Sequence, residues 1–277
     1  MDDVLGMLRD VADELVLPRW RRLADGEVME KNPGDLVTVA DREAEVAITE
    51  WLQDRHPEAI VLGEEATAAD PTVLRSFGAA PHAFTVDPVD GTKNFVHGSP
   101  DFGLMVAELR HGTPVRAWIW QPVTGRAFAA ELGSGAHALT GTGWQPLRCP
   151  PAPADQAQWR LVTSAFRLRE KAFGGLGPLT GSWVSCAVDY PHLAGGDATS
   201  LLYSHTMPWD HAPGTLLATE AGARVCRLDG RDYRTDERAP GHPGARIPWQ
   251  QWLLVTGDPG VHERIRRALA RGLAASG

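Results

Sequence analysis

The segment TVDPVDGTKNF, residues 85–95, places two aspartates three residues apart at the end of an apolar run that predicts a buried strand. Pro88 has no backbone donor, so we expect it to end this strand and to bend the chain between Asp87 and Asp90. The Asp-Gly pair that follows is also typical of an ordinary turn. However, a bend that brings two carboxylates and the Val89 carbonyl together matches the oxygen ligands that hard divalent cations prefer. The segment therefore indicates a turn, a cation site, or both.

The residues after this bend predict the start of a helix. The first amides of such a helix, at Gly91 and Thr92, have no partner within it and attract an anion such as a phosphate group. The Thr92 hydroxyl is either a helix cap or a group that orients a water molecule. The segment thus offers ligands for a cation and for an anion at one corner of the fold.

The composition is typical of an ordinary globular protein, with 277 residues, of which 43% are hydrophobic and 22% charged. Twenty-seven basic and 35 acidic side chains give a net charge of −8, so no basic surface for nucleic acid or a membrane is expected. No apolar run approaches the roughly 20 residues of a membrane helix, and the acidic start MDDVLGMLRD does not fit a secretory signal. We therefore expect a cytoplasmic protein. The three widely spaced cysteines predict neither a disulfide framework nor a zinc motif.

Hydrophobic spacing predicts a mixture of helices and strands in two halves, residues 1–148 and 157–277, joined by the proline-rich linker 149–156. The first half is predicted to contain helices at 4–23 and 40–55 joined by a polar loop at 30–38, buried strands at 59–63 and 83–90, and an antiparallel meander at 102–132. The second half is predicted to contain strands at 159–165, 198–204, 223–230 and 251–258, helices at 182–196 and after 207–214, and a last helix from Pro259 capped by Asp258. The fold class is therefore α/β of the α+β kind.

Four segments resemble the signature segments of the inositol monophosphatase family, in the family's order. They are KNPGDLVTVADREAE at 31–45, GEE at 63–65, DPVDGTKNF at 87–95 and WDHAPG at 209–214. The resemblance covers most of the chain. It implies a layered α-β-α-β-α sandwich, a homodimer, and a lithium-sensitive phosphatase that uses two or three Mg²⁺ ions to hydrolyse a small phosphate monoester. In this family a water molecule activated by the metal attacks the phosphorus directly, without a phosphoenzyme.

The resemblance also implies roles for individual residues. Glu64, Asp87 and the carbonyl of Val89 correspond to ligands of one Mg²⁺, and Asp87, Asp90 and Asp210 to ligands of a second. Asp41 and Thr92 correspond to the pair that helps Glu64 to activate the water. The residues expected to contact the substrate are Asp90, Gly91, Thr92, Gly181, Ser182 and Asp210.

The leaving group is not fixed by these motifs. Tyr203 stands where inositol-specific members carry a glutamate, seven residues before Asp210, and Lys93 stands where they often carry a threonine. With Lys93 and Asn94, the segment DGTKNF resembles that of histidinol-phosphate phosphatases. A 3'-phosphoadenosine 5'-phosphate phosphatase is a further alternative. A metabolite-binding regulator on a phosphatase scaffold is the alternative outside the enzymes. Lys31 is either an ordinary surface lysine or a neighbour of the metal loop.

Overall fold

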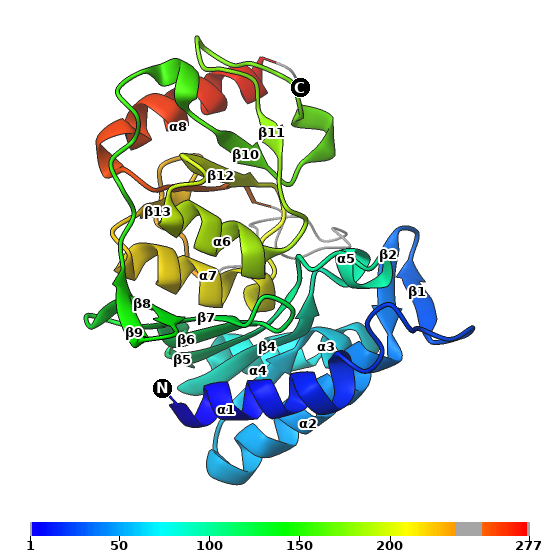
Figure 1. Ribbon diagram of the computed structural model, residues 1–277. Helices are drawn as coiled ribbons and strands as arrows, with labels where there is room; N and C mark the ends of the chain where they lie inside the picture. The colour runs from blue at the N-terminus through cyan, green and yellow to red at the C-terminus, as the bar shows by residue number, and fades with distance from the viewer. Residues whose placement is uncertain (1, 236–250, 276–277) are drawn as a thin grey trace.

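The computed structural model describes residues 2–235 and 251–275 and folds into five alternating layers (Figure 1). The first layer contains α1 (Asp2–Val11) and α2 (Val39–Arg55), and the second is a seven-stranded sheet. The third contains α6 (Cys186–Gly195) and α7 (Pro208–Glu220), the fourth is a five-stranded sheet, and α8 (Pro259–Ala274) covers it as the fifth. The predicted α-β-α-β-α sandwich is therefore confirmed.

The seven-stranded sheet runs in chain order from β3 to β9, so neighbours in sequence are neighbours in space. Its first pair is parallel, with α3 (Glu64–Ala69) and α4 (Val73–Ala79) in the connection, and all later pairs are antiparallel. Its strands are β3 (Ile60–Gly63), β4 (His82–Asp90), β5 (Gly103–Arg110), β6 (Thr113–Gln121), β7 (Arg126–Glu131), β8 (Gly135–Thr140) and β9 (Gly143–Leu147).

The five-stranded sheet has the order β11-β10-β12-β14-β13, with a parallel trio followed by two antiparallel strands. Its strands are β10 (Leu161–Thr163), β11 (Thr180–Gly181), β12 (Ser200–Tyr203), β13 (Arg224–Arg227) and β14 (Leu253–Thr256). Two short 3₁₀ turns, Gln156–Gln158 and Phe166–Leu168, flank β10. The predicted cap of the last helix is confirmed, since the Asp258 side chain accepts a hydrogen bond from the Gly260 amide at 2.7 Å.

Both faces of the large sheet are buried, which explains why its central strands are almost continuously apolar. On β5, Leu104 and Val106 face the core shared with α1 and α2, whereas Met105 points to the other side and packs in the core shared with α6 and α7. That second core also contains Leu201 and Val255 of the smaller sheet. The two sheets therefore share the α6–α7 layer. The predicted division into halves with a linker at 149–156 stays a prediction.

Strand β4 continues through Pro88, so the expectation that this proline ends the strand is wrong. Asp87 lies opposite Met105 and Asp90 opposite Gly103, which leaves one extra residue on β4 and forms a β-bulge. A proline is tolerated at a bulge because the residue there donates no ladder hydrogen bond. The chain bends locally and still places both aspartates at the end of the strand.

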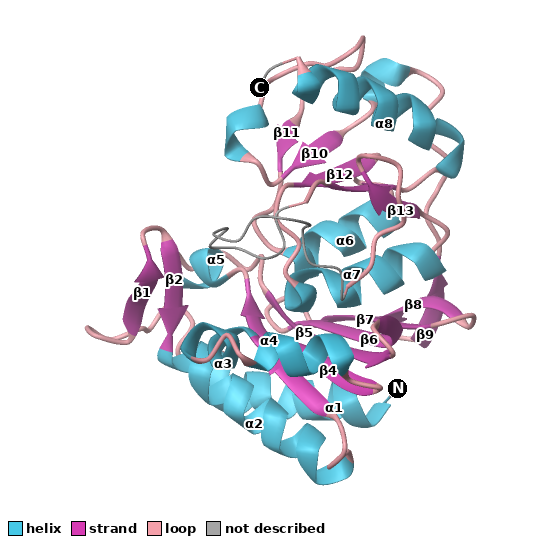
Figure 2. Cartoon of the chain, turned by 180° about the vertical axis from the view of Figure 1, so that it is seen from behind, coloured by secondary structure: helices cyan, strands magenta, loops and turns pink. Residues whose placement is uncertain are grey.

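The N-terminal region differs from the prediction in two places. The helix expected at 4–23 consists of α1 followed by a π-helical turn, Ala12–Val16, and then turns, because Pro18 has no backbone N–H to continue the helical hydrogen bonds. The expected polar loop at 30–38 is a β-hairpin, β1 (Val28–Asn32) and β2 (Asp35–Thr38), beside the short helix α5 (Thr92–Val96) (Figure 2). Gly34 turns it with a φ of 82°, a conformation that glycine adopts without strain.

Four further elements differ from the prediction. Strands β8 and β9 extend the meander beyond residue 132, the helix expected from residue 182 begins at Cys186, and the helix expected after 207–214 begins at Pro208. The late start of α6 leaves residues 182–185 as a loop. None of the helices within the described ranges is long and apolar enough to cross a membrane.

The contact between α6 and α7 provides a test of the central layer. Gly214 of α7 lies against Tyr190, and a Cβ at this position would be 2.1 Å from a ring carbon. We expect Gly214→Ala to lower the free energy of unfolding by about 3 kcal/mol, because overpacking forces both helices apart. As a control, Gly6→Ala in α1 adds a methyl group with nothing within 4 Å and should raise the free energy of unfolding by up to about 1 kcal/mol. Equal thermal denaturation midpoints for the two variants would contradict this packing.

Candidate active site

Three carboxylates meet at the edge of the large sheet. Glu64 begins α3 directly after β3, Asp87 lies near the end of β4, and Asp210 lies in the first turn of α7. One oxygen of each side chain lies within 4.8 Å of the others. Together with Asp90, Gly91 and Thr92 they line a cavity of about 190 Å³. Residues far apart in the sequence thus form one acidic pocket.

The carboxylate of Asp87 lies at the centre of this cluster. It is 2% exposed, and its Oδ1 atom has no hydrogen-bond partner among the described residues. Burial raises the pKa of Asp87 well above its ordinary value, and the nearby carboxylates of Glu64, Asp90 and Asp210 raise it further. An unpartnered buried oxygen among like charges is unfavourable unless a cation is bound there. The all-oxygen ligand set fits a hard divalent cation such as Mg²⁺.

Asp90 joins the sheet to the central helices. Its Oδ2 accepts hydrogen bonds from the Ser185 hydroxyl and, at 2.7 Å, from the Ala187 amide at the start of α6. Burial raises the pKa of Asp90, and these hydrogen bonds oppose the shift. Gly91 makes this approach possible, because its φ is 91° and an added Cβ would be 3.0 Å from Ser185 Cβ. Asp90 is therefore oriented by the start of α6 and the residue just before it.

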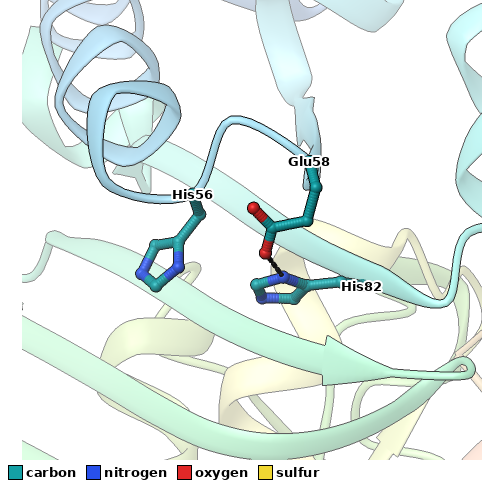
Figure 3. Close-up of side chains that lie close together, drawn as sticks. All are labelled: His56, Glu58 and His82. Carbon is teal, nitrogen blue, oxygen red and sulfur yellow. Dashed lines mark hydrogen bonds and ion pairs between the residues drawn. The ribbon is translucent and has the colours of Figure 1, made fainter.

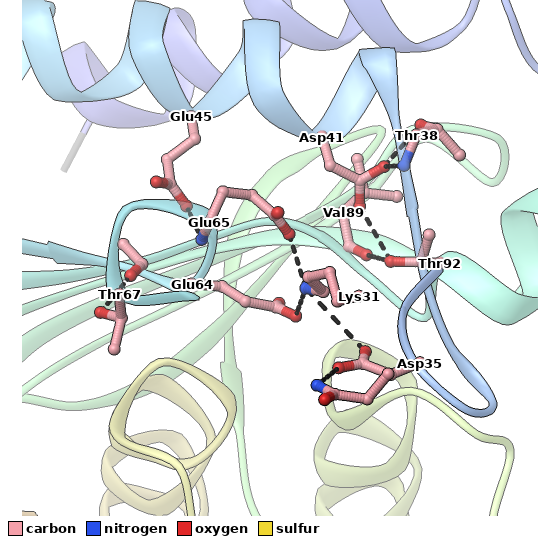
Figure 4. A network of polar contacts seen from close by, with 12 residues as sticks. Lys31, Asp35, Thr38, Asp41, Glu45, Glu64, Glu65, Thr67, Val89 and Thr92 are labelled. Atoms are coloured by element: carbon pink, nitrogen blue, oxygen red, sulfur yellow. Dashed lines mark hydrogen bonds and ion pairs between the residues drawn. The ribbon is translucent and has the colours of Figure 1, made fainter. Parts of the chain in front are cut away.

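A hydrogen-bond network connects α2 to the bulge (Figure 4). Asp41 Oδ2 accepts from the Thr38 amide at 2.9 Å and from the Thr38 hydroxyl at 2.5 Å, which caps α2. Its other oxygen, Oδ1, accepts from the Thr92 hydroxyl at 2.8 Å, and the same hydroxyl lies 3.1 Å from the Val89 carbonyl. Burial raises the pKa of Asp41 to about 6, although the hydrogen bonds from both threonines oppose the shift. The structure thus brings the predicted pair Asp41 and Thr92 into direct contact.

Lys31 lies at this site, so the interpretation of an ordinary surface lysine is wrong. From β1 its Nζ donates to Glu64 Oε1 at 2.6 Å and to Glu65 Oε1 at 2.8 Å, and it lies 3.9 Å from Asp35 (Figure 4). Burial lowers the pKa of Lys31, but the charges and hydrogen bonds of both glutamates outweigh it and raise the pKa overall. The β1–β2 hairpin therefore brings one positive charge to the acidic pocket.

Glu45 holds the start of α3 in place. Its carboxylate accepts hydrogen bonds from the amides of Glu65 and Ala66, both at 2.7 Å, and so satisfies the free donors of the helix (Figure 4). Gly63 permits this approach, because an added Cβ would lie 2.3 Å from Glu45 Cδ. Glu45 thereby fixes the direction in which Glu64 leaves β3.

A second cavity, of about 240 Å³, adjoins the first and shares Asp90, Val184 and Asp210 with it. Ser182 and Tyr203 line it, as do Ser164, Arg169, Ser185, Cys186, Asp189, His205 and His211. Gly181 and Ser182 were both predicted to face the substrate. Ser182 lines this cavity, whereas Gly181 lies beneath the side chain of Arg169.

Asp189 is a polar residue of this cavity that the sequence interpretation missed. It is 1% exposed, and its two oxygens accept from the Trp183 amide at 2.8 Å and the Tyr203 hydroxyl at 3.0 Å. Burial raises the pKa of Asp189 to about 7. Asp189 could have been found from the sequence, because it is an isolated acid within the apolar helix CAVDYPHLAG. Arg169 and Ser185 gave no such signal, because an arginine and a serine are ordinary in loops.

The loop before α6 has an unusual backbone. Val184 adopts a φ of 64°, which is unfavourable for a β-branched residue. Its neighbours fix it, because the Trp183 carbonyl accepts from Asn94 Nδ2 at 2.8 Å and the Trp183 amide is held by Asp189. Asn94 is one of the two residues that suggested histidinol phosphate as a substrate. Its side-chain amide donates to this carbonyl and to the carbonyl of Asp101. Val184 separates the two cavities and lines both.

A second group of possible metal ligands, His56, Glu58 and His82, lies at the opposite end of β4 (Figure 3). His82 Nδ1 lies 2.8 Å from Glu58 Oε1, and its Nε2 lies 3.1 Å from the buried Glu108. This group is a polar cluster whose residues line neither of the two cavities. It contributes nothing to the acidic pocket.

The comparisons with known proteins agree with the geometry. A sequence profile described as "Inositol monophosphatase family" matches residues 4–271. The chain belongs to this family. The inositol-1-monophosphatase of Mycobacterium leprae is 32% identical over 254 residues, which cover 87% of this chain and 81% of that protein.

Two other proteins extend the comparison. "Phosphatase IMPL1, chloroplastic" of Arabidopsis thaliana is 30% identical over 76% of this chain, which spans only 58% of that relative's length. The solved structure of a Thermotoga maritima IMPase superposes with a TM-score of 0.75 and 22% identity, over 100% of this chain and 98% of that one. The chain is thus a phosphoric monoester hydrolase of the inositol monophosphatase family, whose members depend on metal ions and act on small phosphorylated substrates.

The buried carboxyls predict how pH changes the stability of the metal-free protein. Burial raises the pKa of Glu45 from 4.5 to about 7, and the amides of Glu65 and Ala66 oppose the shift. Between these pH values the folded state binds the proton more tightly than the unfolded chain does. The stabilisation that the protonated Glu45 side chain gives to the folded state is therefore present at low pH and is lost as pH rises through about 7. The loss is on the order of 3 kcal/mol.

We expect Glu45→Gln to show a smaller fall in the free energy of unfolding between about pH 4 and pH 7 than the parent protein, because its side chain does not titrate. Glu50, exposed on the same helix, provides the matched control, and Glu50→Gln should keep the parent's slope. Chemical denaturation of metal-free protein at several pH values measures both. Parallel curves for Glu45→Gln and the parent would contradict the assignment.

Proposed function

We propose that the protein hydrolyses a small, inositol-monophosphate-like phosphate monoester with Mg²⁺, by direct attack of water on phosphorus. The observation that carries this proposal is the meeting of the Glu64, Asp87 and Asp210 oxygens within 4.8 Å. We assign Glu64, Asp87 and the Val89 carbonyl to one ion and Asp87, Asp90 and Asp210 to a second, with two or three ions in all. When bound, such ions neutralise the phosphate charge and lower the pKa of water.

The residues around Thr92 hold the attacking water. The Thr92 hydroxyl donates its single proton to Asp41 Oδ1 at 2.8 Å, so the lone pairs of its oxygen are left to accept a hydrogen bond from water. Glu64 reaches the same cavity from α3 and provides the carboxylate on its other side. Asp41 keeps Thr92 in this orientation, since it is itself fixed by Thr38. These three residues position the water, and the Glu64 carboxylate receives its proton.

The substrate would lie across both cavities. Its phosphate would occupy the acidic pocket, near the bound cations and the amides of Gly91 and Thr92, and its leaving group would extend past Val184 toward Ser182. Tyr203 donates to Asp189 here, so the pair offers no free carboxylate for a sugar hydroxyl. Inositol 1-phosphate is therefore not favoured over other esters. Histidinol phosphate is the second candidate, and its only support is the exposed Lys93 at the rim of the pocket.

Asp90→Asn tests the reaction. The asparagine oxygen can still accept from Ser185 and Ala187, so the fold is kept, but a negative charge of the cation site is removed. We expect kcat/KM for phosphate release with Mg²⁺ to fall at least about tenfold, a loss of about 1.4 kcal/mol of transition-state stabilisation or more.

Asp54→Asn, an exposed change at the end of α2, is the control and should keep full activity. An Asp90→Asn variant that retains most of its activity would count against the assignment. A parent protein that hydrolyses no phosphoester with Mg²⁺ would favour the regulatory alternative.

Lithium provides an independent test of the second ion. If Asp90 and Asp210 hold the looser cation, as the family resemblance implies, millimolar Li⁺ should inhibit phosphate release, whereas equal Na⁺ should not. Initial rates at fixed ionic strength and fixed Mg²⁺ measure this. Activity that does not respond to Li⁺ would mean that the second site differs from the one proposed.

We also propose that the protein is a cytoplasmic homodimer, since two-fold dimers are the commonest closed assembly. Sedimentation at micromolar concentration would measure the assembly. A monomer would contradict the proposal.

A further inference from the structure

Arg169 is the permanently charged basic side chain on the wall of the second cavity. Ser164, Ser182 and His205 line the same cavity, which meets the acidic pocket at the residues that the two cavities share. Within residues 2–235 and 251–275, no carboxylate forms an ion pair with Arg169, and its buried Nε atom has no hydrogen-bond partner. A guanidinium without an anionic partner at a cavity wall is a ready recognition site for an anion.

The guanidinium is held in position by apolar and backbone contacts. Its Cζ atom lies 5.0 Å from the centre of the Phe166 ring, within the range of a cation–π contact. A Cβ on Gly181 would also be 3.0 Å from Cζ, so the absence of a side chain there leaves the space that Arg169 occupies. Phe166 is 79% exposed and thus lies at the rim of the fold. These contacts orient the charge without neutralising it.

Asp189, which lines this cavity together with Asp90 and Asp210, does not neutralise Arg169 either. Both oxygens of Asp189 accept other hydrogen bonds, from Trp183 and Tyr203. Burial also raises the pKa of Asp189 to about 7, so its charge is weakened near neutral pH. Ser182 adds a donor, because its oxygen accepts from the Val184 amide at 3.1 Å and its own proton remains to be donated. The wall therefore presents a positive charge and a hydroxyl proton together.

We propose that Arg169 and Ser182 bind a second anionic group, a carboxylate or a second phosphate, on the leaving group of the substrate. The inference rests on the proposed phosphatase function and deepens it: the substrate class is phosphate monoesters that carry a second acidic group. The cationic amine of histidinol phosphate would face Arg169 and is disfavoured. Since the chain's net charge is −8, overall electrostatics oppose an extra negative charge, and any preference for one must come from this local site.

Two matched substrate pairs test this class. In 2-phosphoglycerate a carboxylate replaces one hydroxymethyl group of glycerol 2-phosphate, and 3'-phosphoadenosine 5'-phosphate adds a second phosphate to adenosine 3'-phosphate. We expect the parent protein to show a kcat/KM at least about tenfold higher for the diacid in one of the pairs. The pair that shows it identifies the anion as a carboxylate or a phosphate. A ratio near unity or below in both pairs would overturn the inference, whereas the hydrolysis itself would support the proposed function.

Variants assign the preference to Arg169. Arg169→Met should bring the ratio to within about threefold of unity, mainly through KM of the diacid, and Arg169→Lys should restore part of it. Arg167, exposed on the same 3₁₀ turn and placed over Trp252 instead, provides the control, and Arg167→Met should keep the parent's ratio. If Arg169→Met lowers kcat/KM equally for both members of a pair, Arg169 acts on the reacting phosphate or on folding, and the inference is wrong. If the parent hydrolyses none of the four esters with Mg²⁺, both this inference and the proposed function are wrong.

Discussion

The two hydrogen bonds that Asp90 accepts from Ser185 and Ala187 connect the parts of this molecule. They tie the end of β4 to the start of α6, so the large sheet and the central helices meet at a fixed distance. Asp90 also lines both cavities, which means that the same carboxylate borders the acidic pocket and the proposed leaving-group site. Moving it would disturb the fold, the proposed cation site and the proposed substrate site together.

The parts of the site that lie close in sequence were predictable. Asp87, Val89, Asp90 and Thr92 belong to one segment, and the extra residue at the bulge and the left-handed Gly91 bring them into one pocket. More distant residues, such as Asp210, could be assigned only because their motif resembles that of a known family. The layered fold followed from that resemblance as well, since hydrophobic spacing alone indicates a mixture of helices and strands.

What the sequence did not indicate depends on tertiary contacts. The ion pairs of Lys31 had no local signature, because Glu64 and Glu65 lie 33 and 34 residues further along the chain. The position of Arg169 at the cavity could not be predicted, because it depends on contacts with Phe166 and Gly181 that form only after folding. The same holds for Pro88, whose effect depends on the partner strand: opposite β5 it is part of a bulge rather than a strand end.

Val184 has a consequence for the thermodynamics of ligand binding. A β-branched residue in a left-handed conformation is unfavourable by about 1–3 kcal/mol and persists only where its surroundings determine it. Here Asn94, Asp189 and Asp90 hold the residues on both sides of it. The loop between the cavities is therefore already ordered before a ligand arrives. Its conformational entropy is lost during folding, and a ligand that spans the two cavities gains affinity because it does not have to order this loop.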